Sequence, residues 1–286
     1  MERKITDLYE SYKNGHTSRR SFLRSLVLIT GSSATALAIM PVLDQHQAYN
    51  SGVPQESADL ITEYIKYPGE TGPIRAYLAR PKQGTKFPAV IVIHENRGLV
   101  PHIEDVTRRM AGEGFLALAP DALSPFGGTP ADGTNIPEMF KKLDMAKSVG
   151  DFVDAVKYLK TNPLTTGKVG CTGFCWGGGM TNQVAVNSQD LNAAVPYYGR
   201  QPAPEDVEKI KAPILAHYAE NDSFINPGIP AFEEALKKYH KEYQMFTYPG
   251  TSHGFNNDTS AERYNAAAAK LAWSRTVAFF KEKLKS

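Results

Sequence analysis

The sequence predicts an α/β fold, with a central, mostly parallel sheet and helices on both of its faces. Short β-type segments alternate with helical segments from about residue 63 onwards. This alternation is the order in which crossover helices join parallel strands. Residues 88–94 and 115–119 are continuous apolar runs, as expected of strands that are buried on both faces. Residues 149–159 carry apolar side chains at helical spacing, between the strand at 115–119 and the strand expected from Val169.

The remaining elements follow from local patterns. Residues 63–68 and 74–79 alternate apolar and polar side chains across a glycine-containing turn, which predicts a hairpin. Residues 121–140 are rich in Gly, Pro, Thr and Asp and are predicted to form a surface excursion over the strand ends. Further strands are expected from Val169 and at 193–198, 214–218 and 243–248, and further helices at 103–113, 228–239 and 262–284.

The N-terminal region differs from the rest of the chain. A basic run at residues 17–24 precedes a mildly apolar run at 25–40, which is typical of a signal peptide and too short for a stable membrane span. The Ser-Arg-Arg-Ser-Phe-Leu sequence resembles a twin-arginine export signal, which predicts a periplasmic protein. The alternative is a cytoplasmic protein whose retained N-terminal helix packs on the domain or on a second subunit of a homo-oligomer. Residues 1–40 are thus a leader, 41–60 a linker and 61–286 the α/β domain.

Composition excludes several classes of function. The net charge is +2 and the α/β region contains no basic patch, so nucleic acid is not expected as a partner. Cys171 and Cys175 are the only cysteines, four residues apart, which gives neither a disulfide framework nor a Cys/His metal cluster. The glycines at 177–179 follow a reactive residue and do not form a phosphate or nicotinamide fingerprint. We therefore expect no metal and no cofactor.

The segment 168–180 is the feature around which the chain is organised. Its Gly-Phe-Cys-Trp-Gly sequence at 173–177 has the spacing of a nucleophile elbow, with Cys175 in place of the commoner serine. Side chains two positions from the nucleophile would collide in so tight a strand-to-helix turn, which explains the glycines. The positive end of the following helix favours a thiolate. The alternative is a buried cysteine beside a glycine-rich packing surface.

Two residues downstream complete a catalytic pattern. Asp222 follows a predicted strand, and His253 lies in the loop after the last strand. Nucleophile, acid and histidine in this order are typical of the α/β-hydrolase triad, and strand ends of a parallel sheet meet at one edge. In this triad His253 manages the protons and Asp222 orients it. Glu220 remains an alternative acid, and His94 is a second histidine at a strand end.

Backbone N–H groups are expected to stabilise the oxyanion. One belongs to Trp176, the residue after the nucleophile, and the second to Asn96, which follows the strand at 88–94. Two such donors are commonly the largest catalytic contribution, at about 3 kcal/mol each.

Four motifs together resemble the dienelactone hydrolase family, in the same order and over roughly residues 60–284. They are GFCWGG at 173–178, HENRGL at 94–99, AEND at 219–222 and SHGF at 252–255. The resemblance implies an α/β-hydrolase with a Cys175–Asp222–His253 triad that opens enol-lactones from aromatic compounds. It also implies that Glu95 holds the thiol proton at rest, until an anionic substrate displaces it.

The chain departs from the family where substrate is bound. The family's lactone hydrolases grip the substrate carboxylate with two arginines, one of them four residues after the triad histidine, where this chain has Asn257. The second lies in the region 121–147, which here contains lysines and no arginine. Lysine does not reproduce a bidentate grip. Arg97, Tyr198 and Arg200 stand near predicted strand ends and are expected to contact substrate instead.

These observations predict a cysteine-dependent hydrolase of a small ester or lactone that acts through a thiol ester. Two alternatives use the same scaffold differently. One is a non-catalytic binding or assembly protein of the cell envelope, and the other is an acyltransferase with an alcohol or thiol as acceptor.

Overall fold

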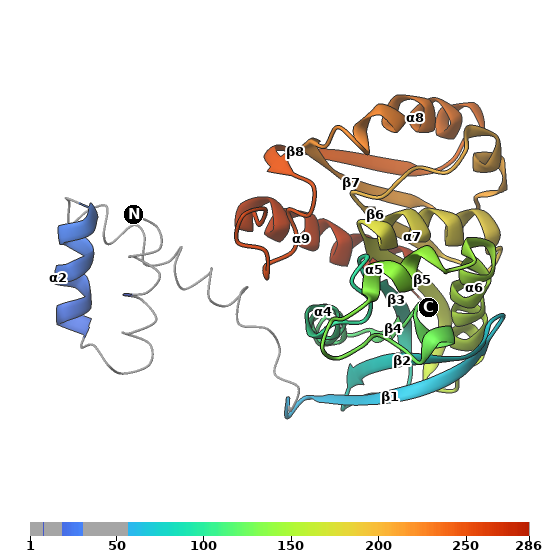
Figure 1. Cartoon of the computed structure of the whole chain (residues 1–286), viewed down its shortest axis with the longest axis horizontal. Coiled ribbons are helices and arrows are strands. Elements are labelled where there is room, and N and C mark those ends of the chain that lie inside the picture. The colour runs from blue at the N-terminus through green and yellow to red at the C-terminus, as the bar shows by residue number, and fades with distance from the viewer. Residues whose placement is uncertain (1–7, 9–18, 31–56, 286) are drawn as a thin grey trace. The chain divides into compact units, whose positions relative to one another are not determined.

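The computed structural model describes residues 8, 19–30 and 57–285 (Figure 1). The chain divides into two compact units, Met1–Gly52 and Val53–Ser286. The first unit contains helix α2 (Arg19–Thr30), whose 12 residues span about 18 Å, less than the roughly 30 Å of a bilayer core. Among the described residues, no helix is long and apolar enough to cross a membrane. Most of the predicted leader and linker lies outside those residues.

The second unit is built on one eight-stranded sheet with the order β1-β2-β4-β3-β5-β6-β7-β8. The pairs β1–β2 and β2–β4 are antiparallel and every other neighbouring pair is parallel, so β1 and β8 form the opposite margins seen in Figure 1. The strands are β1 (Leu60–Gly69), β2 (Gly72–Pro81), β3 (Phe87–Ile93), β4 (Leu116–Pro120), β5 (Thr165–Phe174), β6 (Ala193–Tyr197), β7 (Ile214–Asn221) and β8 (Tyr243–Ser252).

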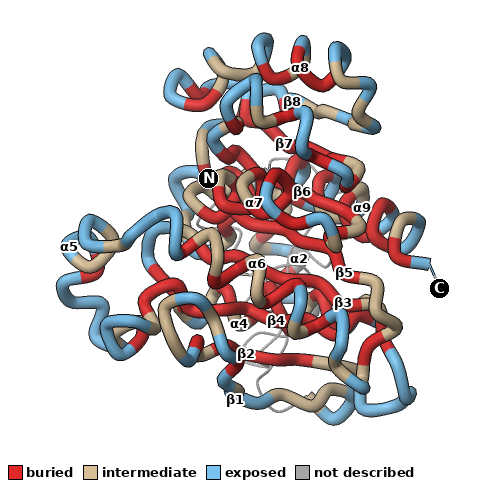
Figure 2. The backbone as a smooth tube through the Cα atoms, turned by 90° about the vertical axis from the view of Figure 1, so that its right-hand side faces the viewer, coloured by how far each residue is buried: buried red, intermediate tan, exposed pale blue. Residues whose placement is uncertain are grey.

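Helices cover both faces of this sheet, as predicted. The side chains of β3 show it, because Val90 and Val92 pack into one core and Ala89, Ile91 and Ile93 into the other. The first core includes α4 (Pro101–Gly112) and α9 (Ala266–Lys283). The second includes α6 (Met145–Thr161), α7 (Trp176–Asn187) and α8 (Ile229–Lys238). The inner strands are buried along their length, whereas β1 is mostly half-buried or exposed (Figure 2). The prediction of an α/β-hydrolase fold is confirmed.

The segment 121–140 is more ordered than its composition suggested. It contains the 3-10 turn η1 (Ser124–Phe126) and the short helix α5 (Ile136–Lys141). The fully buried carboxylate of Asp121 organises its start, accepting hydrogen bonds from the backbone N–H groups of Leu123 and Thr129 and from the Thr129 hydroxyl.

Strands β7 and β8 extend three and four residues beyond their predicted ends. Their pairing resumes after an irregularity, so that Asn221 lies opposite Ser252. The residue directly after each strand is a predicted triad member, Asp222 after β7 and His253 after β8. The register of these two strands therefore brings the acid and the histidine side by side.

Candidate active site

Cys175 occupies the turn between β5 and α7 with a strained backbone. Its φ is 56° and its ψ is −114°, a conformation that is rare for a non-glycine residue. Two hydrogen bonds hold the turn: the Cys175 N–H donates to the carbonyl of Tyr197 (3.1 Å), and the Cys175 carbonyl accepts from the N–H of Gly179 (3.1 Å). The turn is thus tied to the neighbouring strand on one side and to the first helical turn on the other.

The glycines on either side of Cys175 are required by close contacts between backbone segments. A Cβ atom at Gly173 would lie 2.2 Å from the carbonyl oxygen of Gly177. A Cβ atom at Gly177 would lie 2.4 Å from the carbonyl oxygen of His94 and 2.5 Å from that of Ile93. These distances are shorter than van der Waals contact, so the tight strand-to-helix turn requires glycine at both positions.

Asp222 and His253 meet as their strand register requires. The Nδ1 atom of His253 lies 2.6 Å from Oδ2 of Asp222, and the other oxygen of Asp222 accepts from the N–H of Ile225 (3.1 Å). The carboxylate is nearly fully buried, and the imidazole is about one-third exposed. Since the carboxylate holds the proton on Nδ1, Nε2 is left for the thiol. Glu220, the alternative acid, instead accepts from the N–H of Gly250 (2.8 Å).

The charge on His253 depends on both of its partners. Burial disfavours the imidazolium, but the hydrogen bonds and charges of Cys175 and Asp222 outweigh it and raise the pKa of His253 to about 9 from its ordinary 6.5. At neutral pH the His253 ring is therefore an imidazolium.

His94, the second histidine at a strand end, has a different place. Its Nδ1 lies 2.6 Å from the Glu95 carbonyl oxygen, which only accepts, and its Nε2 lies 3.1 Å from the N–H of Ala122, which only donates. The ring is thus a neutral imidazole with both nitrogens engaged. Burial lowers its pKa, and the ring stacks on Trp176 with centroids 5.4 Å apart. His94 is a structural residue beneath the elbow.

Glu95 lies next to Asn257, the position where the family's arginine is missing. Nδ2 of Asn257 donates to a Glu95 carboxylate oxygen at 2.7 Å. The amide orientation is fixed because its Oδ1 accepts from the N–H and hydroxyl of Thr259 (3.0 and 2.6 Å). Asn257 thus supplies a neutral donor to Glu95.

A cavity of about 730 Å³ opens over the thiol. Cys175, His253, Trp176 and Asn96 all line it. The two residues whose N–H groups were predicted to form the oxyanion hole thus border the same space as the nucleophile. The other lining residues are Met145, Ala146, Val149, Gly179, Met180, Gln183, Arg200, Gln201, Phe224 and Ile225.

The three residues predicted to contact substrate lie in different places. Arg200 lines the cavity. Arg97 is exposed and is not one of the described residues that line it. Tyr198 is fully buried, and the centroid of its ring lies 5.1 Å from that of His253. It packs against the imidazole and is not one of the residues that line the cavity.

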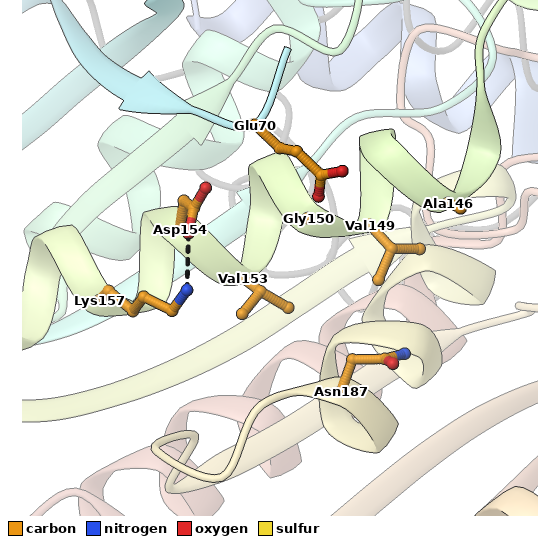
Figure 3. Close-up of a pocket in the computed structure, with 8 residues that line it drawn as sticks. All are labelled: Glu70, Ala146, Val149, Gly150, Val153, Asp154, Lys157 and Asn187. Atoms are coloured by element: carbon orange, nitrogen blue, oxygen red, sulfur yellow. Dashed lines mark hydrogen bonds and ion pairs between the residues drawn. The ribbon is translucent and has the colours of Figure 1, made fainter. Parts of the chain in front are cut away.

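A second, smaller hollow of about 380 Å³ lies on α6 (Figure 3). Val149 and Ala146 line both hollows, whereas Val153 and the exposed ion pair of Asp154 with Lys157 (2.8 Å) line only this one. Its lining contains no cysteine or histidine, whereas the larger cavity is lined by both Cys175 and His253.

Comparison with known proteins identifies the family. The family model described as "Dienelactone hydrolase family" matches residues 74–284. The chain belongs to the dienelactone hydrolase family. It is 34% identical over 253 residues to a protein of Saccharolobus solfataricus assigned as a carboxymethylenebutenolidase, covering 76% of this chain and 97% of that protein. It is 38% identical over 221 residues to the protein usf of Aquifex pyrophilus, covering 74% and 94%.

A solved structure gives the same result. A protein of Klebsiella pneumoniae assigned as a dienelactone hydrolase superposes with a TM-score of 0.71 at 30% identity, covering 78% of this chain and 98% of that one. As a member of the family, the protein is a hydrolase of ester or lactone bonds.

Sequence patterns did not identify the walls of the cavity. The side chains of α6 and of residues 224–225 reach it only through tertiary packing, and no motif marks them. The sole signal was the apolar pair Phe224 and Ile225 within an otherwise polar run.

The elbow contacts predict a difference between two neighbouring glycines. Gly177→Ala is expected to lower the free energy of unfolding by about 3 kcal/mol, because its Cβ would overlap two backbone carbonyls. Gly179→Ala is the matched control: its Cβ would find its nearest neighbour, the backbone N of Arg200, at 3.5 Å, and alanine favours helix by up to about 1 kcal/mol. Chemical denaturation of both variants measures the difference, and equal stability would contradict the role given to Gly177.

Proposed function

We propose that the protein is a cysteine-dependent ester or lactone hydrolase that works through a thiol-ester intermediate. The observation that carries the proposal is the placement of His253, which is hydrogen-bonded to the buried Asp222 and lines the same cavity as the strained Cys175. This is the arrangement of an activated nucleophile, its base and an orienting acid.

In the first half of the reaction the Cys175 thiolate attacks the substrate carbonyl carbon. The carbonyl π electrons move to oxygen, and the oxyanion accepts hydrogen bonds from the N–H groups of Trp176 and Asn96. The electrons then return, the carbon–oxygen bond to the leaving group breaks, and the His253 imidazolium gives its proton to the departing alcohol oxygen. The acyl group is left on sulfur as a thiol ester.

In the second half water replaces the alcohol. Neutral His253 takes a proton from water as it attacks the thiol ester, and the same N–H groups stabilise the second oxyanion. Breaking the carbon–sulfur bond releases the acid and restores the imidazolium–thiolate pair. Asp222 remains ionised throughout and keeps the Nδ1 proton in place.

Three further residues are assigned to this site as proposals. Glu95 receives the thiol proton when the imidazolium–thiolate pair is not formed. Asn257 orients the Glu95 carboxylate for this role through a hydrogen bond from its neutral amide. Arg200 faces the polar end of the substrate, because its side chain is exposed and it borders the cavity.

Variants of the nucleophile test the proposal. Cys175→Ala is expected to lower kcat/KM for methyl acetate by about 10³-fold or more, because the nucleophile of a triad is lost. Mass spectrometry of wild type quenched during turnover should find the acyl mass on the peptide that contains Cys175. Full activity of the alanine variant would overturn the proposal. Product analysis with an added alcohol acceptor separates hydrolysis from acyl transfer.

Cys171 provides an internal control for the reactivity of Cys175. Burial raises the pKa of the Cys171 thiol to about 12, against the smaller effect of its hydrogen bond to Thr181, so it should resist iodoacetamide in the folded protein. Alkylation should therefore modify Cys175 alone and abolish hydrolysis. An unreactive Cys175 in a protein without activity would favour the non-catalytic binding role.

The pH profile reports on His253. Its pKa is raised to about 9, so the imidazolium persists through neutral pH and is lost as the pH rises through that value. We expect kcat/KM to fall above about pH 9. In Asp222→Asn one of the groups that raises this pKa loses its charge, so the fall should begin at lower pH. Initial rates of wild type and variant between pH 6 and 10.5 measure this alkaline fall. A fall at the same pH in both enzymes would show that Asp222 does not raise the pKa of His253.

We also propose that the protein is exported by the twin-arginine route, on the strength of the Arg19–Arg20 pair within the run at 17–24. The double variant Arg19→Lys/Arg20→Lys should keep the protein in the cytoplasmic fraction of a bacterium in which wild type reaches the periplasm. Equal distribution of both forms would favour a retained N-terminal segment.

A further inference from the structure

We propose that the cavity binds an extended apolar chain of the ester, so that the preferred substrates are esters with a chain of about six carbons or more. The inference rests on the proposed function and names its substrate class. It replaces the small ester or lactone expected from the sequence, and it is carried by the walls, the size and the rim of the cavity.

The walls are formed by one face of each of two helices. On α7 the lining residues Trp176, Gly179, Met180 and Gln183 follow helical spacing. The first of them is next to the nucleophile, and the last lies about 10 Å further along the helix axis at 1.5 Å per residue. The cavity therefore extends away from the thiol for a distance that a two-carbon acyl group does not fill.

The opposite wall is equally apolar. It consists of Met145, Ala146 and Val149 from one face of α6, and of Phe224 and Ile225 from the segment after β7.

The volume agrees with this extent. Pockets of about 300–1,000 Å³ hold ligands of drug size, and this cavity measures about 730 Å³. With only a small lactone ring bound, most of the apolar wall of the cavity would remain in contact with water.

The rim shows large apolar side chains that nothing in the described chain covers. The exposed fraction is 76% for Phe224 and 47% for Met145. Both belong to this one cavity, and exposed apolar groups gathered around a hollow are typical of a binding site for an apolar ligand.

The polar groups of the lining leave this apolar path free. Asn96 and His253 belong to the catalytic end described above. The Gln201 side chain packs against Gly228. Arg200 is held against α7 through its backbone carbonyl, which accepts from the Asn182 side chain at 2.9 Å, and the residue itself is exposed to solvent.

Two series of alkyl esters test the inference, one with a growing acyl chain (methyl acetate to methyl octanoate) and one with a growing alcohol (ethyl to octyl acetate), with hydrolysis followed by proton release. A fully buried methylene contributes about 0.8 kcal/mol, or about fourfold in affinity. We expect kcat/KM in one of the two series to rise at least about tenfold from two to six carbons.

Matched variants locate the effect. Val149→Phe narrows the cleft and should lower the ratio of long-chain to short-chain kcat/KM at least about tenfold, whereas Val153→Phe, one turn further along α6 and lining only the polar hollow in Figure 3, should leave the ratio unchanged. Phe224→Ser should lower the ratio as well. Its control is Phe126→Ser, an exposed phenylalanine that does not line the cavity.

The outcomes separate this inference from the function on which it rests. Hydrolysis of short esters that depends on Cys175, with no preference for chain length in either series, would overturn the extended cleft and leave the cysteine hydrolase intact. A chain-length preference that both valine variants reduce equally would also overturn it. Absence of hydrolysis of every ester by wild type would remove both proposals together.

Discussion

The close approach of backbone segments around Cys175 is the constraint on which the rest of the site depends. At Gly177 the first turn of α7 lies against the carbonyl groups that end β3, and at Gly178 it lies against the carbonyl of Tyr197 at the end of β6. Contacts of this kind exist only without side chains. Because α7 is seated so deeply between two strands, the thiol stands at the sheet edge and the next turn of the helix becomes a wall of the cavity.

A second constraint, the register of β7 and β8, places the acid and the histidine. Their pairing through Asn221 and Ser252 delivers Asp222 and His253 to the same edge as the elbow. The carboxylate is buried and the imidazole is partly open, so the acid is shielded from water while the histidine borders both the thiol and the substrate space. The raised pKa of His253 follows from its two partners, Cys175 and Asp222, which outweigh its own burial.

Much of the fold and site was predictable because it follows from local rules. Continuous apolar runs identified the inner strands, and Gly173 and Gly177 identified the elbow, since only a tight turn demands glycine at both positions. The ends of β7 and β8 were placed too early, because a strand that continues past an irregularity leaves no period-2 pattern. Arg97, Tyr198 and Arg200 looked equivalent in the sequence as residues near strand ends. Their different burial is decided by tertiary packing, which spacing along the chain does not encode. The same holds for the α6 wall, where Val149 and Val153 have the same residue type and similar exposure, yet only Val149 also borders the larger cavity.

His94 gives the site a further property. Its two ring nitrogens join the end of β3, through the carbonyl of Glu95, to the start of the segment after β4, through the N–H of Ala122. A protonated ring would have to break the second of these bonds, and burial opposes that protonation by lowering the pKa. His94, which holds the loop that carries Asn96, therefore stays neutral over the pH range in which His253 loses its proton. A change of pH that discharges His253 therefore leaves the His94 tie between these two segments intact.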